Sequence, residues 1–212
     1  MIALEVEVPF ANFRKSFARS YAETYELPPP ATVYGMLLSL VGERRRRRHL
    51  GARLAVGLLS QPKLATSLRK RSRYKYGVAN KQSKLGNAPE YMEVLCGVKF
   101  LLWLDSSLES EKPTLEERAA EALDKPESIE RSGVVCLGLS DDLVNRIARW
   151  NPSPGQPVDW VVVDSKGQSE LPVWVDHVGS AATRWRRYSR ERGTSESPPA
   201  PAWTTILAPE EL

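Results

Sequence analysis

The sequence of 212 residues predicts an α+β fold. Hydrophobic patterns with a period of two alternate with helix patterns, in the order strand, helix, strand, basic insertion, strand, helix, strand. That order is typical of a ferredoxin-like, RRM-like half-open sandwich. We expect this domain over residues 1–150, with a protruding basic β-hairpin at about 62–92. A small β-rich region with a basic, Ser/Pro-rich tail is expected over 151–212.

The first strand and the first helix have the clearest patterns. Apolar residues alternate with Ala or Glu from Ile2 to Val8, which predicts a strand with one buried face. Residues 9–27 show no period, and we expect an ordered loop. Three prolines then lead into an apolar helix over 30–41 that ends at Gly42. Gly35 inside this helix serves either close packing on the sheet or close approach of a ligand.

The remaining elements are predicted from shorter patterns. Thr114 and Glu117 form the capping-box pattern of a helix that runs to Leu123. Residues 140–142 are expected to open another helix, with its apolar face over 143–148. The tail over 194–201 is expected to be loosely held. Strands are predicted over 54–59, 66–76, 94–104, 134–139, 158–163 and 171–178, the last two joined by a turn at 165–167.

Charge is distributed very unevenly along the chain. Residues 44–89 contain fourteen Lys or Arg and no Asp or Glu, whereas the rest of the chain has 16 basic and 26 acidic residues. Such concentrated positive charge repels itself, and a polyanion that neutralises it releases counterions. We therefore expect nucleic acid to be the partner of this segment.

Part of this segment has the pattern of a phosphate-binding strand. Its cations recur with a period of two at Arg69, Arg71, Arg73 and Lys75. In an extended strand they would share one face at a spacing of about 6.6 Å, which resembles the step between phosphates of an extended single strand. The opposite face would carry Tyr74 and Tyr76, aromatic rings suited to stacking on unpaired bases. This favours single-stranded RNA over a duplex; the alternative is a solvated basic hairpin.

The run Arg44–Arg48 is a weaker signal. Five adjacent like charges predict an exposed loop. The loop acts either as a flexible phosphate clamp or only as a solvated surface, and the sequence leaves both open.

Little in the sequence indicates catalysis. His49 ends the arginine run, and His177 shares a predicted strand face with Val173 and Val175, so a core or interface histidine is expected there. No phosphate-binding glycine loop, dinucleotide fingerprint or metal-ligand spacing is present, and the acids over 105–111 are interpreted as solvated. We expect no cofactor, no metal and no enzymatic activity. The alternative is a metal-independent endoribonuclease that uses residues 74–76.

The cellular setting is inferred from cysteines and hydropathy. Cys96 and Cys136 each lie in an apolar run, which predicts two buried thiols in a reducing compartment, hence a cytoplasmic protein. No run of eighteen apolar residues predicts a membrane helix, and the N-terminus lacks the pattern of a secretory signal. No membrane partner is expected.

Two segments resemble a known family. Residues 21–43, YAETYELPPPATVYGMLLSLVGE, resemble the N-terminal signature of the CRISPR-associated Cas-five family, in which an aromatic loop precedes a proline-rich helix start with a glycine. Residues 132–144, SGVVCLGLSDDLV, resemble the second half of that family, where a strand ending in Leu-Gly precedes a capped helix. The resemblance covers residues 1 to about 180.

The resemblance implies an RRM-like fold of the RAMP superfamily with a thumb-like hairpin, here residues 66–90. It implies a subunit of a type I CRISPR surveillance complex (Cascade) that caps the 5′ handle of the CRISPR RNA (crRNA). Implied partners are the Cascade backbone subunit, the large subunit, and target DNA near the PAM-proximal end. Through the complex, a helicase-nuclease or transposition proteins are further partners. One branch of the family cuts precursor RNA; most relatives only bind RNA.

Charge, aromatic content and resemblance together give the candidate RNA-binding residues. They are Arg14, Lys15, Tyr21, Tyr25, Thr32, Tyr34, Gly35, Arg69, Lys70, Arg71, Arg73, Tyr74, Lys75, Tyr76 and Lys81. The backbone N–H groups at the start of the helix, over 31–33, are a further candidate phosphate contact.

Overall fold

The computed structural model describes residues 1–17, 21–73, 86–151 and 155–209, which fold around one large sheet. The helices are α1 (Pro30–Leu40) and α2 (Leu115–Asp124), with short 3₁₀ helices η1 (Pro126–Ser128) and η2 (Ala200–Ala202). The strands are β1 (Ile2–Ala11), β2 (Tyr21–Ala22), β3 (Arg53–Leu58), β4 (Lys63–Arg73), β5 (Gly86–Asp105), β6 (Arg146–Arg149), β7 (Pro157–Val163), β8 (Ser169–Trp174), β9 (Arg184–Thr194) and β10 (Thr204–Thr205).

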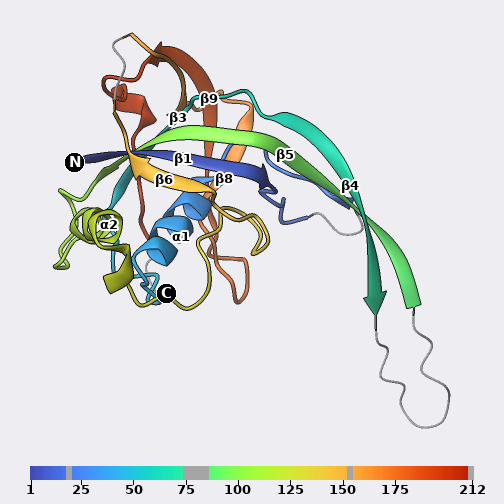
Figure 1. Ribbon diagram of the computed structural model, residues 1–212. Helices are drawn as coiled ribbons and strands as arrows, with labels where there is room; N and C mark the ends of the chain where they lie inside the picture. The colour runs from blue at the N-terminus through green and yellow to red at the C-terminus, as the bar shows by residue number, and fades with distance from the viewer. Residues whose placement is uncertain (18–20, 74–85, 152–154, 210–212) are drawn as a thin grey trace.

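The strands pair in the order β6-β1-β5-β3-β7-β9-β8, with β2 and β4 also paired to β5 and β10 paired to β3. Apart from the short β2, which runs parallel to β5, the ladders are antiparallel. Helices α1 and α2 lie together on one side of β1, β5 and β6 (Figure 1). This arrangement confirms the expected α+β class.

The main core forms between this sheet and α1. Ile2, Leu4, Val6 and Val8 of β1 are buried, which confirms the predicted period of two. They belong to the same core as the apolar residues of α1. Helix α1 begins at Pro30 and ends before Gly42, which has φ of +67°. A Cβ at Gly42 would lie 2.2 Å from the carbonyl oxygen of Glu130, so this stop requires glycine.

Helix α2 begins with the predicted capping box. The Thr114 side chain accepts a hydrogen bond from the N–H of Glu117 at 3.2 Å, and the Glu117 side chain accepts one from the N–H of Thr114 at 2.7 Å. Both bonds satisfy N–H groups that have no partner within the helix. Leu115, Ala119 and Ala122 then join the main core.

Strands β4 and β5 form a ribbon that projects far beyond the rest of the sheet (Figure 1). Along its second half β5 pairs with β3, from Leu58↔Phe100 to Arg53↔Asp105. Along its first half it pairs with β4, from Lys63↔Cys96 to Arg73↔Gly86. Gly97, with φ of +75°, lies where β5 changes from one partner to the other.

The predicted strand over 134–139 and helix over 140–148 are wrong. Apart from the isolated bridge Cys136↔Leu143, residues 134–145 are irregular, and β6 then pairs with β1. The reason is Asp142, whose Oδ2 accepts backbone N–H bonds from Leu139 and from Asn12, both at 2.8 Å. The acidic residue that was expected to cap a helix instead attaches a loop to the end of β1.

The C-terminal residues extend the same sheet. Strands β7 and β8 are joined by the predicted turn, but they are not neighbours, because β9 pairs with both. The prediction of a loosely held tail is also wrong. Ser195 and Ile206 are fully buried, η2 packs on β7, and β10 pairs with β3.

Two expectations on cysteines and membranes can be compared directly with the structure. Cys96 and Cys136 are free thiols, but both are half-buried rather than buried. In the described ranges, no helix has the length and hydropathy needed to cross a membrane.

Candidate nucleic-acid interface

The basic strand is extended, as the charge pattern predicts. Arg69, Arg71 and Arg73 occupy alternate positions of β4, opposite Glu90, Ala88 and Gly86 of β5. Alternate positions of a strand share a face, so these three residues lie on one face of the ribbon. Tyr74, Lys75, Tyr76 and Lys81 lie outside the described residues.

The two faces of the ribbon differ in chemistry. On one face Arg69 is exposed, and its Nη1 lies 3.5 Å from the Asp141 carboxylate. The other face carries Lys70 and Leu68, and Leu68 pairs with Tyr91 of β5. Leu68 is 64% exposed and Tyr91 47% exposed, which is unusual for such large apolar side chains. Sequence reasoning missed Tyr91, because only the register of the hairpin places it beside Leu68.

The aromatic loop is held against the base of the ribbon. Tyr21 pairs with Tyr91 through β2, and its hydroxyl donates to Glu93 Oε1 at 3.1 Å. Asn12, fully buried, donates through Nδ2 to the carbonyl oxygens of Ala22 and Glu93, at 3.3 and 2.6 Å. These bonds position Tyr21 on the face of the ribbon that carries Leu68 and Tyr91.

The other candidates of this loop lie nearby. Arg14, which is exposed, forms a β-bridge with Thr24. The Lys15 N–H donates to the carbonyl of Glu23 at 3.0 Å, and the Lys15 ammonium lies 5.9 Å from the Phe17 ring centre. Tyr25 is half-buried, and burial together with the charge of Glu170 raises its pKa.

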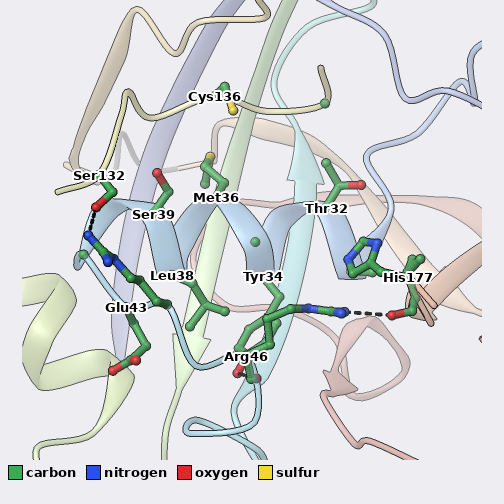
Figure 2. Close-up of a pocket in the computed structure, with 16 residues that line it drawn as sticks. Thr32, Tyr34, Met36, Leu38, Ser39, Glu43, Arg46, Ser132, Cys136 and His177 are labelled. Atoms are coloured by element: carbon green, nitrogen blue, oxygen red, sulfur yellow. Dashed lines mark hydrogen bonds between the residues drawn. The ribbon is translucent and has the colours of Figure 1, made fainter. Parts of the chain in front are cut away.

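A groove of about 470 Å³ runs along the outer side of α1. Figure 2 shows Thr32, Met36 and Ser39 along the helix, with Cys136 and His177 around them. Gly35 faces this groove, and a Cβ at Gly35 would meet no atom within 4 Å. Close packing on the sheet therefore does not explain Gly35; the other interpretation, close approach of a ligand, remains.

Tyr34, a candidate RNA-binding residue, differs from Thr32 and Gly35 because its side chain is buried. Tyr34 is only 2% exposed, and its hydroxyl donates to the carbonyl of Arg46 at 2.8 Å. Burial raises the pKa of Tyr34. The amides of Thr32 and Val33 both donate to the carbonyl of Pro29, at 2.9 and 3.0 Å. The groove therefore presents the Thr32 side chain and the Gly35 backbone, rather than the Tyr34 ring or these two amides.

The prediction of a wholly exposed arginine loop is wrong for part of the run 44–48. Arg46 is half-buried: its guanidinium lies 4.5 Å from the Trp174 ring centre, and Nη2 donates to the carbonyl of Val175 at 2.9 Å. Burial lowers the pKa of Arg46. Arg44 is exposed and donates to Ser132 Oγ, and both residues line the groove along α1. A guanidinium tolerates such partial burial because it both stacks and donates hydrogen bonds.

A buried charge network fixes this loop. His49 is fully buried, with Nδ1 2.8 Å from Glu109 Oε2 and Nε2 2.9 Å from Arg118 Nη1. Glu43 accepts from Arg118 at 2.6 Å and from Arg48 at 2.8 Å. Burial alone would raise the pKa of Glu43, but the Arg45 amide and the two guanidiniums lower it to about 2. The interpretation of Glu109 as a solvated acid is therefore wrong.

His177 also departs from its predicted environment. It lies beyond the end of β8, is exposed, and lines the groove along α1. The part of its ring that faces the groove is partly desolvated, and this together with the charge of the neighbouring Arg46 lowers the pKa of His177. Within the described residues, no group of three or more His, Cys, Asp or Glu is arranged to hold a metal ion.

These features define an α+β protein with an antiparallel sheet, a projecting basic ribbon and a groove along its first helix. The family described as CRISPR-associated protein (Cas_Cas5) matches residues 1–134. A CRISPR-associated protein Cas5 from Myxococcus xanthus (strain DK1622) is 42% identical over 188 residues, which is 87% of each chain. The chain belongs to the CRISPR-associated Cas5 family.

Solved structures with low sequence identity share the fold. A chain of a CRISPR RNA-guided surveillance complex is similar with a TM-score of 0.65 at 12% identity, over 95% of both chains. The crystal structure of a Cas protein is similar with a TM-score of 0.52 at 15% identity, over 94% of this chain and 98% of the other.

Proposed function

We propose that this chain is a non-catalytic, RNA-binding subunit of a type I CRISPR surveillance complex and caps the 5′ handle of the guide RNA. The observation that carries this proposal is the row of arginines at alternate positions of β4, Arg69, Arg71 and Arg73, on a projecting ribbon. Membership in the Cas5 family supports the proposed setting. Similarity in fold to a chain of an RNA-guided surveillance complex is consistent with it.

The ribbon suits a single RNA strand for geometric reasons. Alternate residues of a strand are about 6.6 Å apart, close to the step between phosphates of an extended chain. Arginine also binds two oxygens of one phosphate through parallel hydrogen bonds, which lysine does not. Tyr21 and Tyr91 on the opposite face add stacking surface for unpaired bases.

The groove along α1 is the second part of the proposed RNA site. Loop 136–142 connects it to the ribbon, since Gly138 lines the groove and Asp141 contacts Arg69. The absence of a side chain at Gly35 lets a base or sugar approach the helix backbone. Arg44 and His177 at the rim provide positive or hydrogen-bonding contacts for the phosphates.

We also infer that residues 1–150 have a ferredoxin-like fold with the ribbon as its thumb. Support comes from the strand order β6-β1-β5-β3, with α1 between β1 and β3 in sequence and α2 between β5 and β6. The proposed partners besides RNA are the backbone and large subunits of the complex and PAM-proximal target DNA. Family membership supports these partners.

Binding of a repeat-derived RNA by the purified protein in EDTA tests the proposal. We expect the triple variant Arg69→Ala/Arg71→Ala/Arg73→Ala to lose about tenfold or more in affinity, because each cation contacts a phosphate. A matched triple variant, Lys125→Ala/Arg149→Ala/Lys166→Ala, removes equal charge elsewhere and should bind normally. If the two variants bind the RNA with equal affinity, the β4 arginines do not hold its phosphates. Site-specific cleavage of the RNA would instead establish the endoribonuclease alternative.

A further inference from the structure

Strand β9 is a second basic element that the proposed RNA site does not use. Its eleven residues include five arginines and one acidic residue, Glu191. The strand lies inside the sheet, paired on both sides with β7 and β8, yet all five arginines are exposed. The strand therefore forms a concentrated positive surface. Such a surface favours binding of a polyanionic partner.

Four of these arginines repeat the period-two pattern of β4. Arg184, Arg186, Arg190 and Arg192 share a face with Tyr188. The Tyr188 ring is buried, and its hydroxyl forms a hydrogen bond with Thr204 Oγ1 at 3.0 Å. Tyr188 therefore anchors the face from which the arginines project. Among the described residues, neither Arg186 nor Arg192 forms an ion pair, whereas Arg190 lies 3.5 Å from Glu26.

A groove of about 800 Å³ connects β9 to the root of the ribbon. Arg190 and Trp185 of β9 line one side, and Leu64 of β4 lines the other. Between them Tyr25 and Trp185 place their ring centres 6.4 Å apart at an angle of 59°, and Trp185 is 39% exposed. Such tilted, accessible rings suit contact with a flat base.

The carboxylates of this groove restrict where a phosphate can lie. Glu26 contacts Arg190, and Glu93 accepts hydrogen bonds from the Thr24 amide and the Tyr21 hydroxyl. Glu170 and Lys15 also line the groove. A nucleic-acid backbone would therefore avoid the floor of the groove and run along its β9 rim, with bases turned toward the aromatic rings.

We propose that β9 continues the RNA-binding path, so that one single strand passes from the Leu68 and Tyr91 face of the ribbon, on which Leu64 also lies, across the groove onto Arg186, Arg190 and Arg192. This inference rests on the proposed function, because it starts from RNA held on the ribbon. In this arrangement an unpaired base lies in the groove, and the phosphates lie along the arginines of β9.

The test compares RNA oligonucleotides of about 8 and about 20 nucleotides, the shorter sufficient for the ribbon alone. We expect the longer RNA to bind more tightly than the shorter one. The double variant Arg186→Ala/Arg192→Ala should weaken binding of the longer RNA about tenfold and leave binding of the shorter RNA unchanged. The control Arg149→Ala/Lys125→Ala removes equal charge from β6 and from the end of α2, neither of which lines the groove, and should bind both RNAs like the unmodified chain.

Three results would overturn the inference. If the shorter RNA binds and the longer gains nothing, the β9 path is absent while the proposed function stands. If neither RNA binds, both fail together. If poly-glutamate binds more tightly than either RNA and the Arg186→Ala/Arg192→Ala variant loses that binding, β9 instead docks an acidic protein.

Discussion

Arg118 donates a hydrogen bond from Nη1 to Nε2 of His49 at 2.9 Å, although 69 residues separate them in the sequence. An arginine only donates, so Nε2 accepts and the proton of this neutral ring lies on Nδ1, which donates to Glu109. The same Nη1 reaches Glu43 at 2.6 Å. One guanidinium on α2 thus holds the loop that carries Arg44 and Arg46 to the α1 groove.

Replacing Arg118 by Ala should therefore destabilise the fold. The change leaves His49 Nε2 without a donor and removes one of the two guanidiniums that donate hydrogen bonds to Glu43, so we expect a loss of about 3 kcal/mol in the free energy of unfolding. Urea denaturation measures it. Arg149→Ala, which breaks the exposed pair with Asp124, is the control and should cost under about 1 kcal/mol. Similar losses for both variants would contradict the network's structural role.

Stability should fall in acid through Glu43. Its pKa in the folded chain is about 2, below the ordinary value of 4.5, so the stabilising contribution is present above pH 4.5 and is lost as the pH falls toward 2. Urea midpoints at several pH values measure this loss. In Glu43→Gln, which has no carboxylate to titrate, the acid-dependent part of the loss should be smaller. An unchanged pH profile in that variant would contradict the depressed pKa.

A side chain at position 35 should leave the fold stable but weaken RNA binding. Because a Cβ at this position meets no atom within 4 Å, Gly35→Ala should raise the free energy of unfolding by about 1 kcal/mol through helix propensity. Gly35→Phe should fold equally well, as judged by its urea midpoint, but fill the groove and weaken RNA binding at least about tenfold. If the phenylalanine variant folds and binds RNA normally, the groove along α1 is not an RNA site.

Tyr91 should contribute to RNA affinity without contributing much to stability. It is exposed beside Leu68 and Tyr21, so Tyr91→Ala removes a stacking surface worth about 1–3 kcal/mol per base. Fluorescence anisotropy with a labelled RNA measures the change. Tyr91→Phe keeps the ring and should bind almost normally; equal losses for Ala and Phe would point to the hydroxyl instead.

The elements that the sequence predicts correctly have local causes. The alternation in β1, the proline start and glycine stop of α1, the capping box at Thr114 and the extended basic strand each depend on residues a few positions apart. Each of these patterns has one structural solution that tertiary contacts reinforce. The same holds for the motif that carries the family resemblance, which lies almost wholly in residues 21–43.

The elements that the sequence misses depend on distant partners. Asp142 has the local context of a helix cap, but it bonds to Asn12, 130 residues away. Glu109 looks solvated until the fold places His49 beside it. The place of β9 between β7 and β8, and of Tyr91 beside Leu68, follows from strand order and register, which no local pattern specifies.

The salt dependence of RNA binding tests the grip by β4 most directly. Each phosphate contact on a single strand contributes about 0.7 to the slope of log affinity against log salt concentration. For Arg69→Ala/Arg71→Ala/Arg73→Ala the slope should therefore decrease by about 2, while the matched variant Lys125→Ala/Arg149→Ala/Lys166→Ala keeps the original slope. A slope that stays the same after all three β4 arginines are removed would show that the RNA backbone lies elsewhere.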